Sequence, residues 1–223
     1  MISSFEANKK NLEYWNDFHK NYGYDRKAIE EGIKNDEWMW IFKDEIEEAD
    51  SSVIDLGCGD GSDTLYLLNK GKKVIPCDGS INAIHNIRNN FPEVDNAICF
   101  DMLDSFPFMN NDTDLIVADL SLHYFTREDT IKILKEIRRV LKNRGHLLFR
   151  VNSVNDLNHG AGQGVEIEPN LYMTSDGRYK RFFSSSDIYQ MFNMFNITYL
   201  REEPMKRYKL DKQTFVGRAR NIK

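Results

Sequence analysis

The sequence is short of the features that secreted and membrane proteins need. Among 223 residues it has three cysteines, Cys58, Cys77 and Cys99, and no CxxC pair. All three lie in or beside apolar runs, so we expect buried, reduced thiols and an intracellular protein. No apolar run approaches the roughly 20 residues of a membrane span. The opening MISSFEANKK also lacks the apolar core of a signal peptide. These absences predict a cytoplasmic enzyme or binding protein with no membrane partner.

Positive charge is not in excess either. The chain has 30 Lys and Arg against 35 Asp and Glu, a formal net charge of -5. A broad nucleic-acid footprint needs clustered excess Lys and Arg, so the balance argues against nucleic acid as a partner. The basic runs 138–144 and 206–212 leave two interpretations open, a local macromolecular contact or a solvated face. The sequence has no HxE or HExxH spacing, which predicts no metal site, and it lacks a GxSxG elbow and a phosphate loop.

The chain does contain apolar runs of strand length that alternate with helical patterns. This alternation is typical of a parallel α/β sheet, and continuous Val, Ile, Leu and Phe indicate strands covered on both faces. The expected strands are 52–55, 73–78, 97–101, 114–120 and 145–151, followed by two runs at 197–203 and 213–220. The short linker between the last two runs predicts an antiparallel pair. The expected helices are 63–69, 80–90 with Ser80 as N-cap, 127–142 and 185–195.

We expect one domain over 1–223 with four parts. Residues 1–50 are mostly helical and aromatic, and either cover the sheet or line a pocket in part. Residues 51–151 form the first half of the sheet. Residues 152–183 are rich in Gly, Asn, Ser and charge with little periodicity, which is common in a lid or binding loop. Residues 184–223 supply a helix and the final strand pair.

A glycine-rich turn follows the first expected strand. The stretch VIDLGCGDGS places Gly57, Gly59 and Gly61 in a G-x-G-x-G order, with Asp55 two residues before the first glycine. In a doubly wound sheet such a turn meets a ligand at the carboxyl ends of the strands, where bare backbone lets the ligand approach. Gly61 is expected to let helix and strand pack closely. Asp78 ends the next strand about twenty residues on, where a nucleotide-binding unit places its ribose acid.

The stretch DLGCGDG resembles the first motif of class I S-adenosylmethionine-dependent methyltransferases. CDGSINAI (77–84), the strand-end Asp101, DLIVADLSLHYF (114–125) and RRVLKNRGHLLF (138–149) resemble the motifs that follow. The resemblance implies a Rossmann-like α/β fold with a seven-stranded, mostly parallel sheet, an antiparallel final strand and helices on both faces. The stretches SLHYF, LLFRVNSVND and GRYKRFFSSSDI look like small bacterial methyltransferases of the tellurite-resistance type.

The resemblance also implies S-adenosyl-L-methionine as cofactor and assigns site residues. Asp55 is expected near the methionine ammonium, Asp78 at the ribose, and Asp101 at the adenine amino edge. The implied cofactor-binding set is Asp55, Gly57, Cys58, Gly59, Gly61, Asp78, Gly79, Ser80, Asp101, Met102, Leu103, Asp119 and Leu120. Asp119 and Leu120 are expected to face the methyl group.

The reaction class that this implies is in-line methyl transfer to a small-molecule acceptor. Alternatives are a protein or RNA acceptor, or a cofactor-binding module without activity. His123 and Asp119 are the catalytic candidates, His123 as a base or as a packed loop residue, and His159 has the same two interpretations. Glu166 and Glu168 either bind a cationic substrate or are solvated. The run KRFF, residues 180–183, is expected to close over the cofactor.

Overall fold

The computed structural model describes residues 4–34, 36 and 38–223. The strands of its main sheet are β1 (Val53–Leu56), β2 (Val74–Asp78), β3 (Ile98–Cys99), β4 (Thr113–Asp119), β5 (Leu141–Asn152), β9 (Asn196–Met205) and β10 (Lys212–Arg220). The helices are α1 (Ser4–Tyr22), α2 (Arg26–Ile33), α3 (Lys43–Glu48), α4 (Ser62–Asn69), α5 (Ile81–Asn90), α6 (Arg127–Val140) and α7 (Ser185–Met191). Two 3₁₀ turns are η1 (Trp38–Phe42) and η2 (Leu157–His159).

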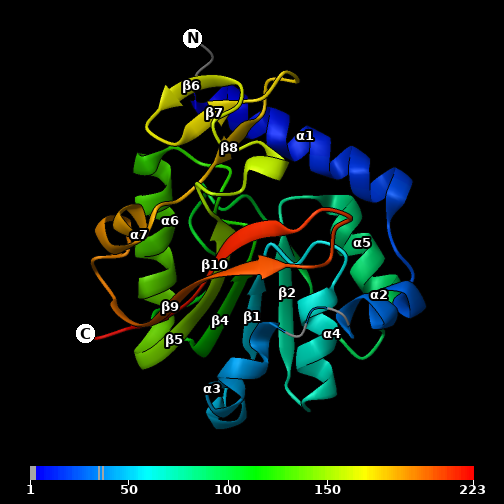
Figure 1. The fold of residues 1–223 in the computed structure, drawn as a ribbon. Helices are drawn as coiled ribbons and strands as arrows, with labels where there is room; N and C mark the ends of the chain where they lie inside the picture. Colours follow the sequence, from blue (N-terminus) through cyan, green and yellow to red (C-terminus); the bar gives the residue numbers. More distant parts are fainter. Residues whose placement is uncertain (1–3, 35, 37) are drawn as a thin grey trace.

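The main sheet has seven strands in the order β3-β2-β1-β4-β5-β10-β9 (Figure 1). β1 to β5 pair in parallel, and β10 runs antiparallel to both β5 and β9. The predicted mostly parallel sheet, with the last two strands as an antiparallel pair, is therefore confirmed. The order reverses between β1 and β4, and this reversal is where open α/β sheets bind their ligands.

Helices cover both faces of this sheet. Along β4, Ile116 and Ala118 face a core with α6 and α7, whereas Leu115 and Val117 face η1, α3 and α4. A third cluster joins α2, α4 and α5. This two-sided burial explains why the strand sequences are continuously apolar instead of alternating.

The helix starts follow local capping chemistry. The Ser80 side chain accepts a hydrogen bond from Ala83 N and caps α5, as predicted. Thr126 caps α6 in the same way, and Ser184 with Asp187 forms a capping box on α7. α6 ends at Val140 and β5 begins at Leu141, so the last residues of the expected helix belong to the strand.

Segment 152–183 has more regular structure than its composition suggests. It contains a three-stranded sheet of β6 (Val165–Glu168), β7 (Leu171–Met173) and β8 (Tyr179–Arg181). Leu171 and Tyr179 are buried against Ala7 of α1. The strands are three or four residues long, too short for a periodic signal, and Leu171 and Tyr179 are buried against α1 instead of against the main sheet, while Val165 is exposed.

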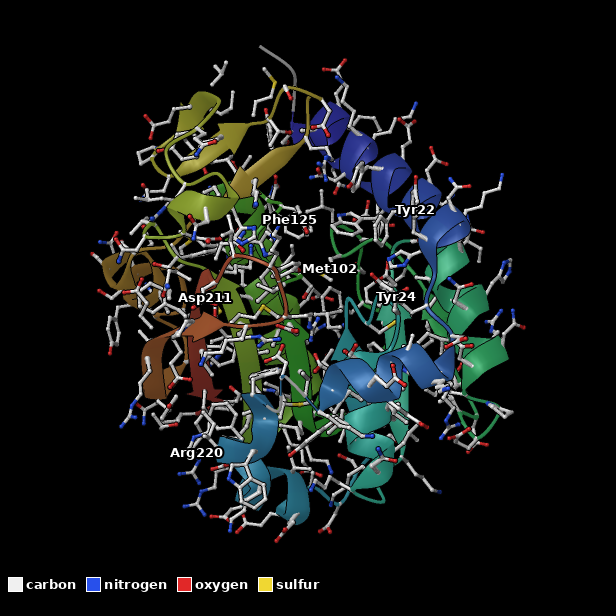
Figure 2. The ribbon with its side chains drawn as sticks, turned by 45° about the vertical axis from the view of Figure 1, so that its right-hand side comes forward. Tyr22, Tyr24, Met102, Phe125, Asp211 and Arg220 are labelled. Atoms are coloured by element: carbon white, nitrogen blue, oxygen red, sulfur yellow. The ribbon has the colours of Figure 1, made fainter. Side chains whose placement is uncertain are left out.

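α1 and the β6–β8 sheet lie together on the side where β1–β4 end (Figure 1). The backbone N–H of Arg181 in β8 donates to His123 O, 2.7 Å away, beyond the end of β4. Figure 2 shows Met102 and Phe125 on this side, while Arg220, the last residue of β10, lies at the opposite edge. α1 lies over this edge, whereas η1 and α3 pack against one face of the sheet. No helix among the described residues has the length and apolar character to cross a membrane.

The cysteines differ from the expectation in one case. Cys58 and Cys77 are buried, but Cys99 is exposed. Cys99 lies in β3, which is two residues long and forms one edge of the sheet, so no further strand covers it. The prediction of three buried thiols is wrong at this position.

Candidate functional site

The turn after β1 presents bare backbone toward α1. Gly57, Gly59 and Gly61 all have positive φ, at 81°, 51° and 90°, where other residues are strained. A Cβ on Gly57 would lie 2.3 Å from Ser121 Cβ, so the turn closes tightly on the segment after β4. At Gly59 the nearest atom to such a Cβ is His19 Cε1, at 3.7 Å. The turn is therefore tightly packed at its first glycine, whereas at its second a Cβ would make only an ordinary contact with His19.

The third glycine serves a different contact from the one predicted. A Cβ on Gly61 would lie 2.5 Å from Phe91 Cε2 and 2.6 Å from Ile87 Cδ1. Both side chains belong to α5 and its C-cap, so Gly61 lets α4 pack on α5 and not on a strand. Cys58, also in the predicted set, is buried, and its N–H donates to Cys77 O at 2.9 Å.

Asp78 at the end of β2 meets the glycine turn, as the sequence predicts. Its Oδ2 accepts a hydrogen bond from Gly59 N at 3.0 Å, and its Oδ1 accepts one from Ser80 N at 2.8 Å. Burial raises the pKa of this carboxyl, although the two N–H groups and His19 oppose the shift. Gly79 is packed closely by α1, since a Cβ there would lie 2.4 Å from Leu12 Cδ2. The acid, the turn and the α5 N-cap form one connected group.

α1 covers the ends of β2 and β3 with polar side chains. The Asn8 amide donates to Asp101 Oδ2 at 2.6 Å, and His19 Nδ1 lies 3.0 Å from Asp60 Oδ1. The second oxygen of Asp101 accepts from Leu103 N at 2.9 Å. Asp101, predicted to meet an amino group of adenine, therefore already binds an amide NH₂, a donor of the same type. The Met102 methyl lies 3.2 Å from the Cβ that Gly57 lacks.

Asp55 is held inside the sheet. It is 1% exposed, and Thr64 Oγ1 donates to its Oδ2 at 2.6 Å. Burial, with the nearby charges of Asp119 and Asp78, raises the pKa of Asp55 to about 7, against the hydrogen bond from Thr64. Its predicted contact with an ammonium group stays a prediction, and a cation at this place would stabilise the ionised form.

Asp119 forms a buried ion-pair network that the sequence analysis did not anticipate. Arg150 Nε and Nη2 each donate to one Asp119 oxygen at 2.6 Å, and Arg150 also binds both oxygens of Asp36. Arg207 reaches Asp36 at 3.0 Å. Burial raises the pKa of Asp119, but the Arg150 charge and hydrogen bonds outweigh it and the net shift is downward. A carboxylate with a lowered pKa and a bidentate partner is a poor proton acceptor.

The residue after Asp119 is strained. Leu120 has φ of 49°, a region that a branched side chain rarely adopts. Its N–H donates to Arg150 O at 2.9 Å. The strained backbone turns the chain sharply at the end of β4 and brings Ser121 against Gly57.

His123 is packed beneath segment 152–183. It is 3% exposed, its ring lies 4.2 Å from that of Tyr124, and its Nδ1 has no hydrogen-bond partner among the described residues. Burial lowers the pKa of His123 well below its usual value, and the charges of Lys212 and Lys180 lower it further. The imidazole is therefore neutral at pH 7 and weakly basic, which favours the packed interpretation over a general base.

The remaining candidates of segment 152–183 are engaged in structure. Phe182 and Phe183 are buried, and Arg181 pairs with Glu168. Glu168 also accepts from Arg127 N, so it is neither free for a substrate nor simply solvated. His159 Nε2 donates to Leu210 O at 3.0 Å and its ring lies 5.2 Å from Tyr208. Of the two cations in the run KRFF, Arg181 has a carboxylate partner and Lys180 has none among the described residues.

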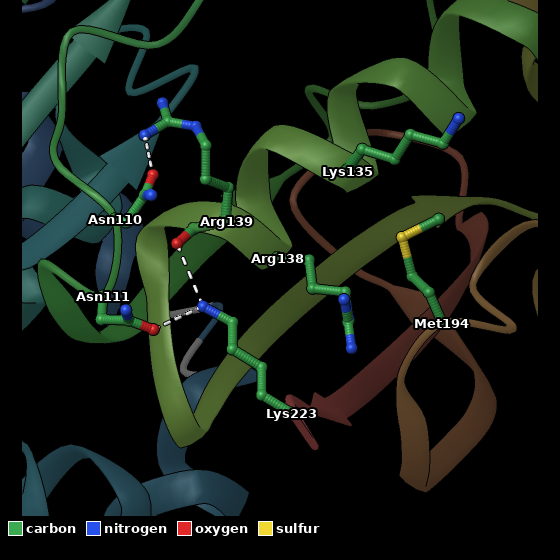
Figure 3. A pocket seen from close by; sticks show the side chains of 7 residues that line it. All are labelled: Asn110, Asn111, Lys135, Arg138, Arg139, Met194 and Lys223. Carbon is green, nitrogen blue, oxygen red and sulfur yellow. Dashed lines mark hydrogen bonds between the residues drawn. The ribbon is translucent and has the colours of Figure 1, made fainter.

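A hollow of about 460 Å³ lies elsewhere, beside the C-terminal end of α6 (Figure 3). It includes Arg138 and Arg139 from the basic run 138–144. Arg139 pairs with Glu136, and the Lys223 amine donates to Asn111 Oδ1 and to two backbone carbonyls. Arg139 and Lys223 are therefore engaged in contacts within the chain, and Arg138 donates to Ile222 O at 3.1 Å.

Sequence reasoning missed Arg150, Asp36 and the polar residues of α1. A signal for Arg150 was present, because a charged residue inside the apolar run GHLLFRV needs a buried partner. Asn8, Asn11 and His19 gave none, because asparagine and histidine on a helix also occur on solvated faces. Their partners lie between 41 and 113 residues away along the chain.

The strand order, the glycine turn and the acids at the strand ends define a class I methyltransferase fold. Residues 54–149 match a protein-family model described as a methyltransferase domain. A tRNA N(3)-methylcytidine methyltransferase of Drosophila melanogaster is 31% identical over 184 residues, which are 77% of this chain and 54% of the relative. Residues 54–149 thus match a methyltransferase domain, and the chain has the fold of class I S-adenosylmethionine-dependent methyltransferases.

Solved structures agree with this fold. A methyltransferase from Methanosarcina mazei has a TM-score of 0.71 at 19% identity, over 82% of this chain and 97% of the other. The Burkholderia thailandensis 1,6-didemethyltoxoflavin-N1-methyltransferase, solved with 1,6-didemethyltoxoflavin and S-adenosylhomocysteine, also has a TM-score of 0.71 at 16% identity, covering 100% and 92%. The chain spans about half the length of the curated relatives it matches.

Proposed function

We propose that the protein transfers a methyl group from S-adenosylmethionine to a small-molecule acceptor. The observation that carries the proposal is the group formed by Asp78, Gly59 and Ser80, a carboxylate hydrogen-bonded to the glycine backbone at the switch point of the sheet. Asp78 accepts two N–H bonds and has lone pairs left for hydroxyl donors.

Several buried polar atoms also fit an adenosyl ligand. Asn11 Oδ1, Trp15 Nε1 and His123 Nδ1 are buried without a hydrogen-bond partner among the described residues. The Asn11 side-chain amide N–H donates to Tyr124 O, and the Trp15 ring makes a T-shaped contact with the Tyr124 ring. These atoms therefore lie where α1 covers the carboxyl edge of the sheet. Unpaired polar atoms cost about 1–3 kcal/mol each, and a polar ligand at this edge would recover part of that cost.

The residues around the glycine turn would hold different parts of the cofactor. The bound cofactor supplies an electrophilic methyl group. Asp78 would hold the ribose diol, Asp101 with Met102 and Leu103 would meet the adenine, and the turn at Gly57 and Gly59 would approach the methionine end. The protein contributes mainly orientation, which can supply roughly 7–11 kcal/mol of the barrier. α1 and segment 152–183 would exclude water as a cover over the acceptor.

A small-molecule acceptor is supported by the acidic net charge and by the toxoflavin methyltransferase neighbour, which this chain matches along its whole length. An RNA acceptor is the second candidate, because the Drosophila tRNA methyltransferase matches 77% of the chain. The two differ in salt dependence. Binding of an RNA weakens steeply between 50 and 200 mM salt, by roughly 10³-fold or more for six phosphate contacts, whereas a small neutral acceptor responds little.

Calorimetry tests the cofactor assignment. We expect S-adenosylhomocysteine to bind the wild type and NAD to show no binding. Asp78→Ala should weaken the binding at least tenfold, since a hydrogen bond to a charged group contributes about 1.5–3 kcal/mol. Asp95→Ala, an exposed acid beyond α5, is the control and should bind as the wild type does. Failure of the folded wild type to bind, or normal binding by Asp78→Ala, would refute the assignment. Turnover of labelled donor with an acceptor panel separates an enzyme from a binding module.

A further inference from the structure

Among the described residues beside His123, one half-buried cation, Lys180, has no carboxylate partner. Segment 152–183, the β9–β10 loop and the start of β10 contribute several cations. Lys212 pairs with Asp156 at 3.2 Å, and both are buried. Arg178 pairs with Asp176 at 2.9 Å, and Arg207 pairs with Asp36 at 3.0 Å. Lys180 of β8 lies among them, and no carboxylate of the described residues lies within ion-pair distance of its amine.

The Lys180 amine makes one hydrogen bond, to His159 O at 2.5 Å. An ammonium group has three N–H donors, so it retains capacity for an acceptor. The Lys180 side chain is half-buried. Asp156, whose charge raises the pKa of Lys180, already accepts hydrogen bonds from Lys212 Nζ and Gln213 N. A partly buried ammonium without a counter-ion is costly unless a ligand supplies the charge.

Lys180 precedes the residue of β8 that contacts the loop after β4. Its neighbour Arg181 donates its backbone N–H to His123 O, and the Lys180 charge lowers the pKa of His123. The ring of His123 lies against Tyr124, which interacts electrostatically with Asp78 and the Arg178 guanidinium. The unpartnered Nδ1 of His123 is a second polar atom that lacks a ligand at this place.

We propose that Lys180 is the specificity-determining residue of the acceptor site and that the acceptor is a small organic acid, whose carboxylate pairs with the Lys180 ammonium. This rests on the proposed methyltransferase function. The carboxylate supplies the missing counter-charge between β8 and the His123 loop. The methyl-accepting atom is then another group of the same molecule, held toward the cofactor turn.

The protonation of Lys180 gives the proposal a measurable pH range. Burial lowers its pKa to about 8, with further lowering by Lys212 and Arg178 and opposition from Asp156. Lys180 is thus mostly charged at pH 7 and mostly neutral at pH 9. Affinity for an acid should therefore fall over this range, while affinity for a neutral analogue should not.

The test is calorimetry on protein saturated with S-adenosylhomocysteine. The probes are lactate and 4-hydroxybenzoate, each beside its primary amide, at pH 7 and pH 9. We expect at least one acid to bind tenfold more tightly than its amide at pH 7 and this preference to shrink at pH 9. Lys180→Met should abolish the preference, and Lys180→Arg should retain it. Lys209→Met, which changes an exposed lysine of the β9–β10 loop, should behave as wild type.

Each other outcome contradicts the proposal. Equal affinity for every acid and its amide, no binding of either acid, or a preference that survives in Lys180→Met refutes it. If Lys180→Met instead weakens S-adenosylhomocysteine but not methylthioadenosine, which lacks the amino-acid part, Lys180 serves the cofactor carboxylate. Failure of the wild type to bind S-adenosylhomocysteine refutes the proposed function itself, and that step is measured first. A cofactor-induced rise in the melting temperature of Lys180→Met verifies that the variant is folded.

Discussion

The two sides of the carboxyl edge are held together by different kinds of contact. Around β1 and β2, bare glycine backbone and short side chains meet a partly buried carboxylate, and the hydrogen bonds run from backbone N–H groups to Asp78. Around β4, β5 and β10, long charged side chains pair with one another, as Arg150 does with Asp119 and Asp36. The first arrangement fixes one shape. The ion pairs of Arg150 balance buried charge, so their strength depends on the protonation of Asp119 and Asp36.

The largest effect in this comparison is expected from the charged side. Arg150→Met leaves Asp119 and Asp36 buried without their main partner, and removal of one member of a buried pair costs about 3–5 kcal/mol. Urea denaturation at pH 7 measures the loss. Lys142→Met breaks the more exposed pair with Asp114 and should cost less than about 1 kcal/mol.

The pH dependence of the same variant sharpens the test. In the wild type the lowered pKa of Asp119 means that this carboxylate stabilises the fold above its unfolded pKa. The contribution is lost as the pH falls through the lowered folded value. Without Arg150, burial should raise the pKa of Asp119, so the carboxyl is protonated at a higher pH. The deficit of Arg150→Met should therefore be larger at pH 7 than at pH 5, and a deficit independent of pH would refute the pairing.

The backbone side should respond to a single methyl group. Gly57→Ala places a Cβ 2.3 Å from Ser121 Cβ in a residue with φ of 81°. Overpacking typically costs about 1–3 kcal/mol, with strain added, and the turn must shift to relieve it. We expect a loss of stability by urea denaturation together with a loss of S-adenosylhomocysteine binding by calorimetry. Gly71→Ala has a similar φ of 73° with nothing within 4 Å of the added atom. It should show the strain alone and bind normally.

The difference between the two arrangements explains which site residues could be predicted from the sequence. The arrangement around β1 and β2 is local in sequence. The glycines stand within five positions and Asp78 ends the next strand, so spacing predicted Gly59 and Asp78, and the capping pattern predicted Ser80. The charged side joins Asp36, Asp119 and Arg150, which are far apart in the chain and carry no spacing signal. The three short strands of segment 152–183 were missed because α1 buries two of their apolar residues.

Asp55, in β1, tests whether a residue of the glycine-turn region lowers the stability of the fold while contributing to cofactor binding. Its pKa of about 7, against an unfolded value near 3.9, means that ionising it in the folded state costs stability. For this raised carboxyl the folded protein loses stability as the pH rises between about 4 and 7. Asp55→Asn removes the charge and keeps an acceptor for Thr64. We expect the variant to gain on the order of 1–2 kcal/mol over the wild type at pH 8, with less gain at pH 5, and to bind S-adenosylhomocysteine more weakly. A variant less stable than wild type at pH 8 would contradict the assigned ionisation.

The smallest expected effect is on the thiol reactivity of Cys99 in the edge strand β3. Cys99 is exposed in β3, whereas Cys58 and Cys77 are buried and burial raises the pKa of both. A thiol reagent such as 5,5′-dithiobis(2-nitrobenzoate) should therefore react with one cysteine in the native protein and with three in urea. The Cys99 reaction should be slow at pH 7 and faster at pH 9, because burial and Asp78 also raise its pKa. Cys99→Ser should remove the native reaction and leave stability unchanged. Reaction of a second thiol, Cys58 or Cys77, without urea would mean that the glycine turn opens. The region around β1 and β2 would then be less rigid than its backbone contacts imply.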